Sequence, residues 1–236
     1  DIAPTRGAPP LPVCPGWKCP LMSTVFIIGG AGKVGRALAA QLASRGHRVR
    51  ALHRSTAQAA MLQQLGAVPV AGDLVAMDAH VLAEQLNGSE VLVFTAGAGG
   101  KGGVEATRAV DGAGLEKAVA AARLAGVRRL LLVSAFPEAG RGTVVSDTFE
   151  VYMAVKKAAE VHLAQSDLDW VILRPGTLTD APGTGRINAG PAIAYGDISR
   201  EDVAATLLAL IERPAISRVI IEATAGDTPI AEALGG

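Results

Sequence analysis

Short apolar runs alternate along the chain with stretches in which apolar residues recur at helical spacing. The apolar runs predict seven strands, at residues 25–28, 49–52, 68–70, 90–94, 128–133, 169–173 and 218–222. The stretches between them predict helices, at residues 33–45, 55–66, 77–86, 104–126, 148–165 and 199–213. Strands that are apolar throughout and alternate with helices are typical of a parallel sheet with both faces buried. We therefore predict an α/β fold, a doubly wound parallel sheet of about seven strands with helices on both faces.

A glycine-rich turn joins the first predicted strand to the first predicted helix. Gly29, Gly32 and Gly35 have the spacing G-x-x-G-x-x-G. In a dinucleotide-binding turn of this kind, the first glycine makes the turn, the second lets a pyrophosphate approach the backbone, and the third lets the helix pack closely on the strand. The N–H groups at the start of the helix then face the phosphate oxygens. The motif predicts a Rossmann-like sheet that binds a dinucleotide; the alternative is a glycine-rich turn without a ligand.

The ends of the next three predicted strands carry further candidates for cofactor binding. The second strand ends at His53-Arg54 without a carboxylate, and a basic residue there accommodates the 2′-phosphate of NADP, whereas an acidic one binds the ribose of NAD. This favours NADP(H) over NAD, unless Arg54 is only a solvated loop residue. Asp73 could hydrogen-bond the adenine amino group or cap the next helix. The small residues Ala96 and Gly97 would let the backbone approach the ribose.

The overall composition narrows the classes of function. The chain of 236 residues carries 22 basic and 22 acidic side chains, so no net charge attracts nucleic acid or an anionic membrane. Aromatic residues make up only 3%, which argues against stacking of single-stranded nucleic acid. No apolar run reaches the roughly 18 residues that a membrane span needs. We therefore expect a small-molecule substrate, with neither nucleic acid nor membrane as a partner.

The first 22 residues differ from the rest of the chain. They contain several prolines and both cysteines, Cys14 and Cys19, and show no periodic pattern. The segment lacks the continuous apolar stretch of a secretory signal, so residues 1–22 are expected to be disordered or an extension added by cloning or upstream translation. Met22 would then be the natural start. Residues 23–236 are expected to form a single NAD(P)-binding domain, in which residues 176–198 shape a substrate pocket.

Cysteine and histidine usage predicts no metal site. Two thiolates, Cys14 and Cys19, do not complete a tetrahedral zinc site by themselves. The histidines show no metal-ligand spacing; they are His47, His53, His80 and His162. Because no cysteine lies in the predicted folded body, a reducing, cytoplasmic compartment is expected.

Tyr152 and Lys156 form the candidate catalytic pair. They stand four residues apart in the predicted helix 148–165, so both lie on one face of it. A nearby ammonium favours the phenolate, and Lys156 is therefore expected to lower the pKa of Tyr152 from its ordinary value of about 10. Tyr152 could then protonate a carbonyl oxygen while a nicotinamide delivers hydride to the carbon. The spacing is common by chance, but it is informative on the helix after the fifth strand of a nucleotide-binding sheet.

Several motifs together resemble the short-chain dehydrogenase/reductase superfamily, from about residue 23 to the end. They are the turn at 29–35, Asp73-Leu74, Ser134, Tyr152-x-x-x-Lys156 and Arg174-Pro175-Gly176. Residues 133–136 and 178–185 resemble the atypical NAD(P)H-binding branch, which holds nitrogen-metabolite-repressor-like proteins and biliverdin-IXβ/flavin reductases. The resemblance implies that Ser134 orients the substrate, that Tyr152 is the acid and that Lys156 holds the nicotinamide ribose. It also implies a monomer or homodimer and cofactor contacts at Lys33, Val34, Leu74, Pro175, Thr177 and Leu178.

One position departs from the family pattern. Active members often carry two serines at the end of the fifth strand, and Ala135 stands where the second, catalytic serine is expected. Ser134 could then be structural. The leading interpretation is an NADP(H)-dependent oxidoreductase that reduces a small carbonyl, quinone or flavin-like acceptor by hydride transfer. The alternative is a catalytically silent NAD(P)H-binding redox sensor or regulatory protein. An epimerase or dehydratase of nucleotide sugars is disfavoured, because the C-terminal region is short for a sugar-binding domain.

Overall fold

The computed structural model describes residues 22–99, 102–140 and 145–235. Of the predicted N-terminal extension, residues 1–21 lie outside the described residues. The strands are β1 (Thr24–Ile28), β2 (Arg48–His53), β3 (Val68–Ala71), β4 (Val91–Phe94), β5 (Arg129–Val133), β6 (Asp169–Pro175), β7 (Thr177–Thr179), β8 (Arg186–Gly190), β9 (Asp197–Ser199), β10 (Val219–Ala225) and β11 (Thr228–Pro229). The α-helices are α1 (Lys33–Ser44), α2 (Thr56–Gln64), α3 (Ala79–Leu86), α4 (Gly103–Thr107), α5 (Gly114–Leu124), α6 (Asp147–Ala164), α7 (Arg200–Ile211) and α8 (Ile230–Ala233).

The main sheet has nine strands in the order β11-β8-β10-β6-β5-β4-β1-β2-β3. The seven strands from β10 to β3 are parallel, which confirms the predicted sheet. β8 extends the sheet antiparallel to β10, and β11 pairs antiparallel with β8. From β1 the chain proceeds to β2 and β3 on one side and then returns to β4 on the other. In sheets of this kind, ligands bind at the carboxyl ends of the strands beside this reversal.

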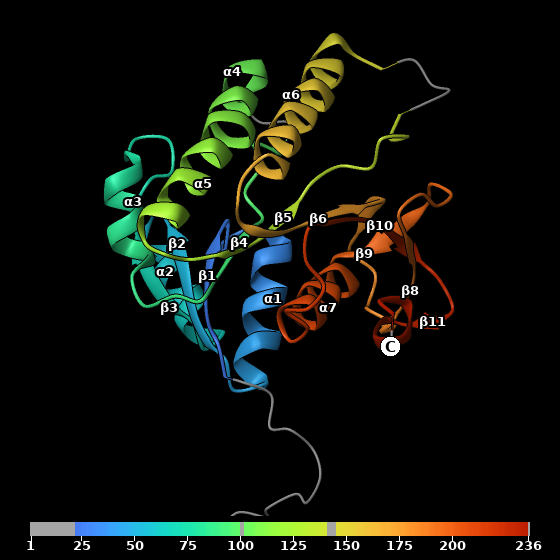
Figure 1. The fold of residues 1–236 in the computed structure, drawn as a ribbon, viewed down its shortest axis with the longest axis horizontal. Helices are drawn as coiled ribbons and strands as arrows, with labels where there is room; N and C mark the ends of the chain where they lie inside the picture. The colour runs from blue at the N-terminus through green and yellow to red at the C-terminus, as the bar shows by residue number, and fades with distance from the viewer. Residues whose placement is uncertain (1–21, 100–101, 141–144, 236) are drawn as a thin grey trace, which may run out of the picture.

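Helices cover both faces of the sheet, as Figure 1 shows, with α1 and α7 on one side and α3, α5 and α6 on the other. The reason lies in the strands, where successive side chains point to opposite faces. In β1, Val25 and Ile27 join the apolar cluster under α1, α2 and α7, whereas Phe26 and Ile28 join the cluster under α3, α5 and α6. Because all four side chains are buried, β1 lies at the centre of both halves of the core.

The helix predicted at residues 104–126 is interrupted. A π-helical segment, Arg108–Ala113, separates α4 from α5. Two glycines in this region let the chain approach its neighbours closely. A Cβ at Gly112 would lie 3.3 Å from Val155 of α6, and one at Gly114 would lie 2.9 Å from Leu74. The widened turn also carries Asp111, which is only 2% exposed.

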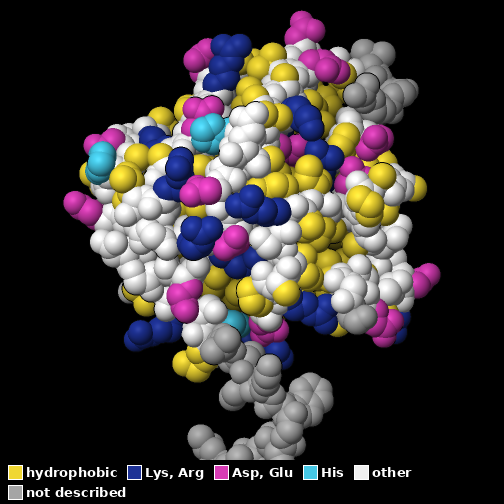
Figure 2. All heavy atoms as spheres, in the orientation of Figure 1, with side chains coloured by type: hydrophobic (Ala, Val, Ile, Leu, Met, Phe, Trp, Pro, Cys, Tyr) yellow, Lys and Arg dark blue, Asp and Glu magenta, His cyan; other side chains and the backbone are white. Residues whose placement is uncertain are grey.

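The surface carries charges of both signs. On the face drawn in Figure 2, basic and acidic side chains are interspersed, in keeping with the equal totals of 22 and 22 in the sequence. Within the described part of the chain, no helix is both long enough and apolar enough to cross a membrane.

Candidate active site

The glycine turn after β1 has the tight geometry that its sequence predicts. Gly29 has a φ of +93°, in the left-handed region that favours glycine, and a Cβ there would lie 2.4 Å from the backbone nitrogen of Ala96. At Gly35, in α1, a Cβ would lie 2.4 Å from the carbonyl oxygen of Gly29. Neither position can accept a side chain without moving backbone. The turn is therefore held against the start of α1 and against the loop that follows β4.

The start of α1 is arranged for an anion. Gly32 precedes the helix, no side chain caps it, and the first turn contains no acidic residue. The first N–H groups of such a helix are free to bind phosphate oxygens. Val34 packs against the apolar core. The exposed Lys33 forms an ion pair of 2.5 Å with Asp180, which also contacts Arg200 at 2.7 Å.

A cavity of about 510 Å³ runs from this turn past the carboxyl ends of β2, β3 and β4. Seven of the predicted cofactor-binding residues line it: Gly29, Gly32, Arg54, Asp73, Leu74, Ala96 and Gly97. Six others do not, namely Lys33, Val34, Gly35, Pro175, Thr177 and Leu178. The volume is in the usual range for ligand sites. Together with the uncapped helix, these walls fit the adenosine and pyrophosphate parts of a dinucleotide. We refer to this space as the dinucleotide cavity.

The end of β2 supplies basic groups to this cavity. Arg54 is exposed, and its backbone N–H donates to the side-chain oxygen of Gln58 at 2.8 Å. Nδ1 of His53 is buried and has no hydrogen-bond partner among the described residues. A ligand atom in the cavity would satisfy such a group.

Asp73 does not cap the next helix, so that alternative is wrong. Its carboxylate accepts a hydrogen bond from the N–H of Val75 at 2.9 Å, within its own loop. Asp78 caps α3 instead, because it accepts from the N–H of Val81 at 2.9 Å. Contact of Asp73 with adenine stays a prediction.

The region after β6 meets the end of β5. Pro175 is buried at the end of β6, and Leu178 packs against the core. The hydroxyls of Thr177 and Tyr195 lie 2.6 Å apart. The ring of Tyr195 packs edge-on against Phe136, with 5.3 Å between the ring centroids. The predicted substrate-pocket region thus contacts the strand end that carries Ser134, although its role in substrate binding stays a prediction.

Tyr152 and Lys156 lie on α6, but Lys156 has other partners than expected. Its ammonium is buried, donates to the carbonyl oxygen of Val133 at 3.0 Å and forms an ion pair of 3.5 Å with Asp111. Burial lowers the pKa of Lys156, while Asp111 opposes this change. Burial, and then the charge of Asp111, raise the pKa of Tyr152 to about 12. The expected lowering of the Tyr152 pKa is therefore wrong as a net effect, because burial and Asp111 raise it.

Ser134 follows β5 directly and is 6% exposed. Its backbone N–H donates to the carbonyl oxygen of Leu173 at 2.8 Å. Its hydroxyl is buried and has no hydrogen-bond partner within the described segments. A free hydroxyl suits the predicted contact with a ligand, but it does not decide between a catalytic and a structural role. Ala135, the next residue, offers no hydroxyl.

Sequence reasoning missed Asp111. The residue stands in an alanine-rich stretch that predicts an ordinary helix, and its partner Lys156 is far away in the sequence. A signal was present in Gly112 and Gly114, since glycine inside a helix costs about 1 kcal/mol and often marks close packing. The acidic residue beside these glycines was a candidate for a buried contact.

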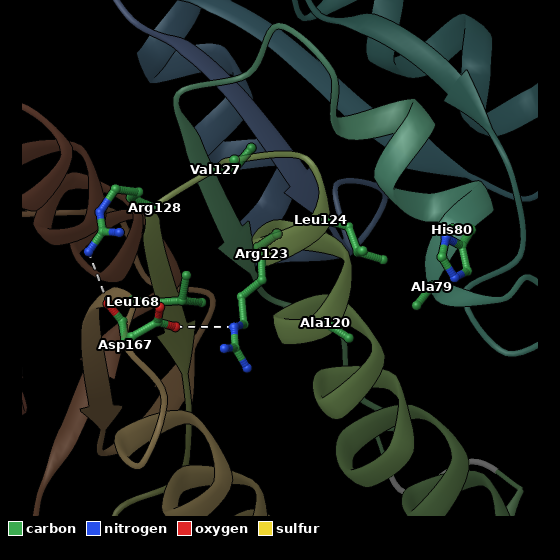
Figure 3. Close-up of a pocket in the computed structure, with 11 residues that line it drawn as sticks. Ala79, His80, Ala120, Arg123, Leu124, Val127, Arg128, Asp167 and Leu168 are labelled. Atoms are coloured by element: carbon green, nitrogen blue, oxygen red, sulfur yellow. Dashed lines mark hydrogen bonds and ion pairs between the residues drawn. The ribbon is translucent and has the colours of Figure 1, made fainter.

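A second cavity, of about 670 Å³, lies at the opposite edge of the sheet (Figure 3). It is lined by the start of α3, the end of α5 and the residues that precede β5 and β6. Arg123 and Asp167 form an ion pair of 3.1 Å in it. None of the predicted site residues lines this cavity, so it is not the candidate active site.

The described residues contain no group of three or more His, Cys, Asp or Glu side chains that could hold a metal ion. His53 lines the dinucleotide cavity, and His47 contacts Glu212 at 3.4 Å. Cys14 and Cys19 lie outside the described residues.

The chain is similar to a known protein family and to several solved structures. Residues 29–214 match the model of the NAD(P)H-binding protein family. The chain is 36% identical over 211 residues to "Uncharacterized sugar epimerase YhfK" of Bacillus subtilis (strain 168), a match that spans 89% of this chain and 98% of that protein. Among solved structures it resembles a "Putative NAD-dependent epimerase/dehydratase" from Bacillus halodurans, with a TM-score of 0.82, 29% identity and coverage of 90% and 98%. It also resembles "ChuY: An Anaerobillin Reductase" from Escherichia coli O157:H7, with a TM-score of 0.69, 26% identity and coverage of 87% and 98%.

The family match spans the glycine turn, the ends of β2, β3 and β4 that line the dinucleotide cavity, and the Tyr152–Lys156 pair. The fold of these neighbours is the parallel sheet described above. A nicotinamide dinucleotide is therefore the cofactor of this fold. The chain belongs to the NAD(P)H-binding family.

Proposed function

We propose that the protein is an NADP(H)-dependent oxidoreductase that reduces a small carbonyl, quinone or flavin-like acceptor. One observation carries the proposal: Lys156 buries its ammonium at the end of β5, one helical turn from Tyr152. This is the edge of the sheet at which the dinucleotide cavity opens. Burying a charge is costly, and chemistry that uses the charge is a reason to bury it there.

Each group then has a task. The turn at residues 29–35 and the start of α1 hold the pyrophosphate, and the bound nicotinamide supplies hydride. Tyr152 keeps its proton at neutral pH, because burial and Asp111 raise its pKa to about 12. Its phenol can therefore donate to the acceptor oxygen and release the proton as negative charge develops there. The Lys156 ammonium stabilises the phenolate that remains.

The choice of NADP rests on the end of β2. Arg54 and His53 line the cavity there, and β2 contributes no carboxylate that would favour the free ribose of NAD. The exposed guanidinium of Arg54 can bind a 2′-phosphate in a charge-assisted, bidentate manner.

The names of the relatives point to two chemistries. The similarity to a protein titled as a reductase supports reduction. Other similar proteins are named as epimerases. In this chain, the stretch between β6 and α7 contains only the short strands β7, β8 and β9. So small a region supports a small acceptor better than a nucleotide sugar.

The second candidate is a redox sensor that binds NAD(P)H without turnover. Ala135, which lacks the hydroxyl of a catalytic serine, favours this function. The oxidoreductase and the redox sensor both predict NAD(P)H binding, but only the oxidoreductase predicts turnover.

Turnover and binding therefore test the proposal together. NADPH and NADH are titrated into the purified protein, and the loss of nicotinamide absorbance is then followed with a panel of quinones, flavins and aldehydes. We expect tighter binding of NADPH than of NADH and reduction of at least one acceptor. Tyr152→Phe keeps the ring, so NADPH should bind as before while turnover falls by about 100-fold or more. Tight NADPH binding without turnover on any acceptor, unchanged by Tyr152→Phe, would leave the sensor as the function.

A further inference from the structure

We propose that Asp111 is a positioning residue of the active site, which holds the Lys156 ammonium charged and in place beside Tyr152. The proposal rests on the proposed roles of Tyr152 and Lys156 and adds a third group to them. Asp111 lies in the π-helical segment Arg108–Ala113, and its carboxylate is 1% exposed. π-helical turns are rare in proteins, and those that occur are often found at functional sites.

The first argument is the pairing of two buried charges. The side chain of Lys156 is 7% exposed, and its ammonium lies 3.5 Å from Oδ1 of Asp111. A buried ammonium without a counter-charge would lose its proton. Asp111 supplies that counter-charge, while the carbonyl oxygen of Val133 accepts a hydrogen bond at 3.0 Å. An ammonium has three N–H donors, so these two partners leave one donor for a ligand or for Tyr152.

The second argument is that Asp111 also fixes a wall of the dinucleotide cavity. Its Oδ2 accepts a hydrogen bond from the backbone N–H of Ala98 at 2.9 Å. Both Gly97 and Ala98 line the cavity. A Cβ at Gly97 would lie 3.1 Å from Oδ1 of Asp111, so the loop after β4 approaches the carboxylate closely. One side chain thus joins the cofactor loop to the catalytic helix.

The third argument concerns the charges around the pair. Asp111 is the charged group that acts on Tyr152, and it raises the pKa of that phenol in addition to burial. Lys156 is influenced by Asp111 from the π-helical segment and by Glu160 from α6. Glu160 is already paired with Arg174 of β6 at 2.7 Å and with Lys157 at 3.8 Å. Asp111 is therefore the carboxylate that neutralises the ammonium of Lys156.

These charges predict the direction of a pH effect. Reduction needs a protonated Tyr152 and a charged Lys156, so activity is lost as the pH rises through the lower of the two pKa values. In Asp111→Asn, the pKa of Lys156 falls because the counter-charge is gone. The pKa of Tyr152 falls too, because a nearby negative charge is gone. Both changes move the alkaline limb of the pH profile toward lower pH.

The first experiment measures this limb in the full-length protein. Asp111→Asn keeps the shape of the side chain and an oxygen that can accept from Ala98. We expect the alkaline limb of kcat/KM for reduction to shift down by about 1 pH unit or more. Asp169→Asn is the matched control, since it removes a carboxylate that pairs with Arg128 at the opposite edge of the sheet. Asp169→Asn should leave the limb unchanged, and an unshifted limb in Asp111→Asn would overturn the proposal.

The second experiment needs neither cofactor nor turnover, so it separates this proposal from the proposed function. The chain contains two tyrosines, and Tyr195→Phe leaves Tyr152 as the sole one. Ultraviolet absorbance of the phenolate then reports the titration of Tyr152 directly. Adding Asp111→Asn should move this titration to lower pH. An unchanged titration would contradict the proposal even in an active enzyme, whereas a shifted one would support the coupling even if no acceptor is reduced.

A third comparison applies if Asp111→Asn folds but is too unstable for the kinetic and titration measurements. The double variant Asp111→Asn/Lys156→Met removes both buried charges, so it should unfold at a higher temperature than Asp111→Asn alone. A double variant that is no more stable than the single one would show that the two charges are not coupled, and would overturn the proposal.

Discussion

The surroundings of Tyr152 make the stability of the folded protein depend on pH. Burial, followed by the charge of Asp111, raises the pKa of its phenol to about 12, compared with about 10 in an unfolded chain. A group with a raised pKa in the folded state contributes its full stabilisation below the unfolded pKa. That contribution is lost as the pH rises through the folded pKa, because the unfolded chain releases the proton first.

This shift gives a prediction for Tyr152→Phe, which has no proton to lose. Between about pH 9 and pH 12, the free energy of unfolding should fall by about 2 kcal/mol more in the wild type than in the variant. Denaturant unfolding at a series of pH values, followed by circular dichroism, measures the difference. Parallel curves for the two proteins would show that the phenol is not held in its neutral form.

Arg54 should decide the preference between the two nicotinamide cofactors. Its guanidinium is exposed at the cavity, where a 2′-phosphate would lie. A hydrogen bond to a charged group contributes about 1.5–3 kcal/mol, so Arg54→Ala should weaken NADPH binding by about 10- to 100-fold and leave NADH binding nearly unchanged. Arg48→Ala is the matched control, because Arg48 is an exposed arginine at the other end of the same strand. Equal losses for NADPH and NADH would argue against a contact between Arg54 and the 2′-phosphate.

At the scale of elements, hydrophobic periodicity was sufficient for the parallel sheet and its helices. The strands β1, β2, β4, β5 and β6 bury apolar side chains on both faces, so their sequence pattern follows directly from the fold. The pattern does not distinguish an α-helical turn from a π-helical one, since both place apolar residues on one face. For that reason the break at Arg108–Ala113 was not predicted. The short strands β7 and β9 were missed because three residues carry too little pattern.

The candidate site was predicted in part for the same reason. Gly29 and Gly35 follow from local geometry, and the loop residues that line the cavity follow from the order of the strands. The sequence did not predict the partner of Lys156, because Asp111 and Lys156 belong to different helices and come together only through tertiary packing. Local spacing placed Lys156 near Tyr152 and could not show which group neutralises it.

The ion pair between Lys33 and Asp180 links two elements at the start of α1, directly after the glycine turn. Lys33 begins α1, and Asp180 lies just after β7 and also contacts Arg200. Phosphate oxygens at the start of α1 would compete with Asp180 for Lys33. Asp180→Asn should therefore bind NADPH a few-fold more tightly in a fluorescence titration, since exposed ion pairs are weak. Asp197→Asn, an exposed carboxylate in the same region, controls for net charge; an equal gain there would show a general charge effect.

Arg129 joins the start of β5 to the end of α7. It is 7% exposed, and its guanidinium donates to the carbonyl oxygens of Leu210 at 2.7 Å and Ile216 at 3.0 Å. Arg129→Met removes the guanidinium bonds to both carbonyl oxygens, although that of Leu210 also accepts from the N–H of Arg213 at 3.3 Å; it should lower the free energy of unfolding by about 1–3 kcal/mol. Arg128→Met, at the exposed neighbouring arginine, should change it by less than about 0.5 kcal/mol. Similar losses in both variants, measured by urea unfolding, would contradict the proposed link.

At the scale of the whole molecule, two cavities lie at opposite ends of the strands. The dinucleotide cavity opens at the carboxyl ends of β2, β3 and β4, beside the reversal in strand order between β1 and β4. The other cavity lies where β5 and β6 enter the sheet (Figure 3). The two regions share the core but no lining residue, so binding at one can be distinguished from binding at the other.

Cofactor binding should stabilise the whole fold. It should give additional protection from hydrogen exchange only around the dinucleotide cavity. A ligand at 100 times its dissociation constant adds about 2.7 kcal/mol to the folded state, which corresponds to a rise in Tm of about 5–10 °C for a chain of this size. NADPH should produce this rise, and NADH at the same concentration a smaller one. Hydrogen exchange should slow at residues 29–35, 72–75 and 95–98, which contain the turn and the cavity loops. Exchange at residues 123–128 and 167–168, around the other cavity, should slow only as far as the general stabilisation requires. Protection centred on that second region would place the dinucleotide at the wrong edge of the sheet and contradict the site described here.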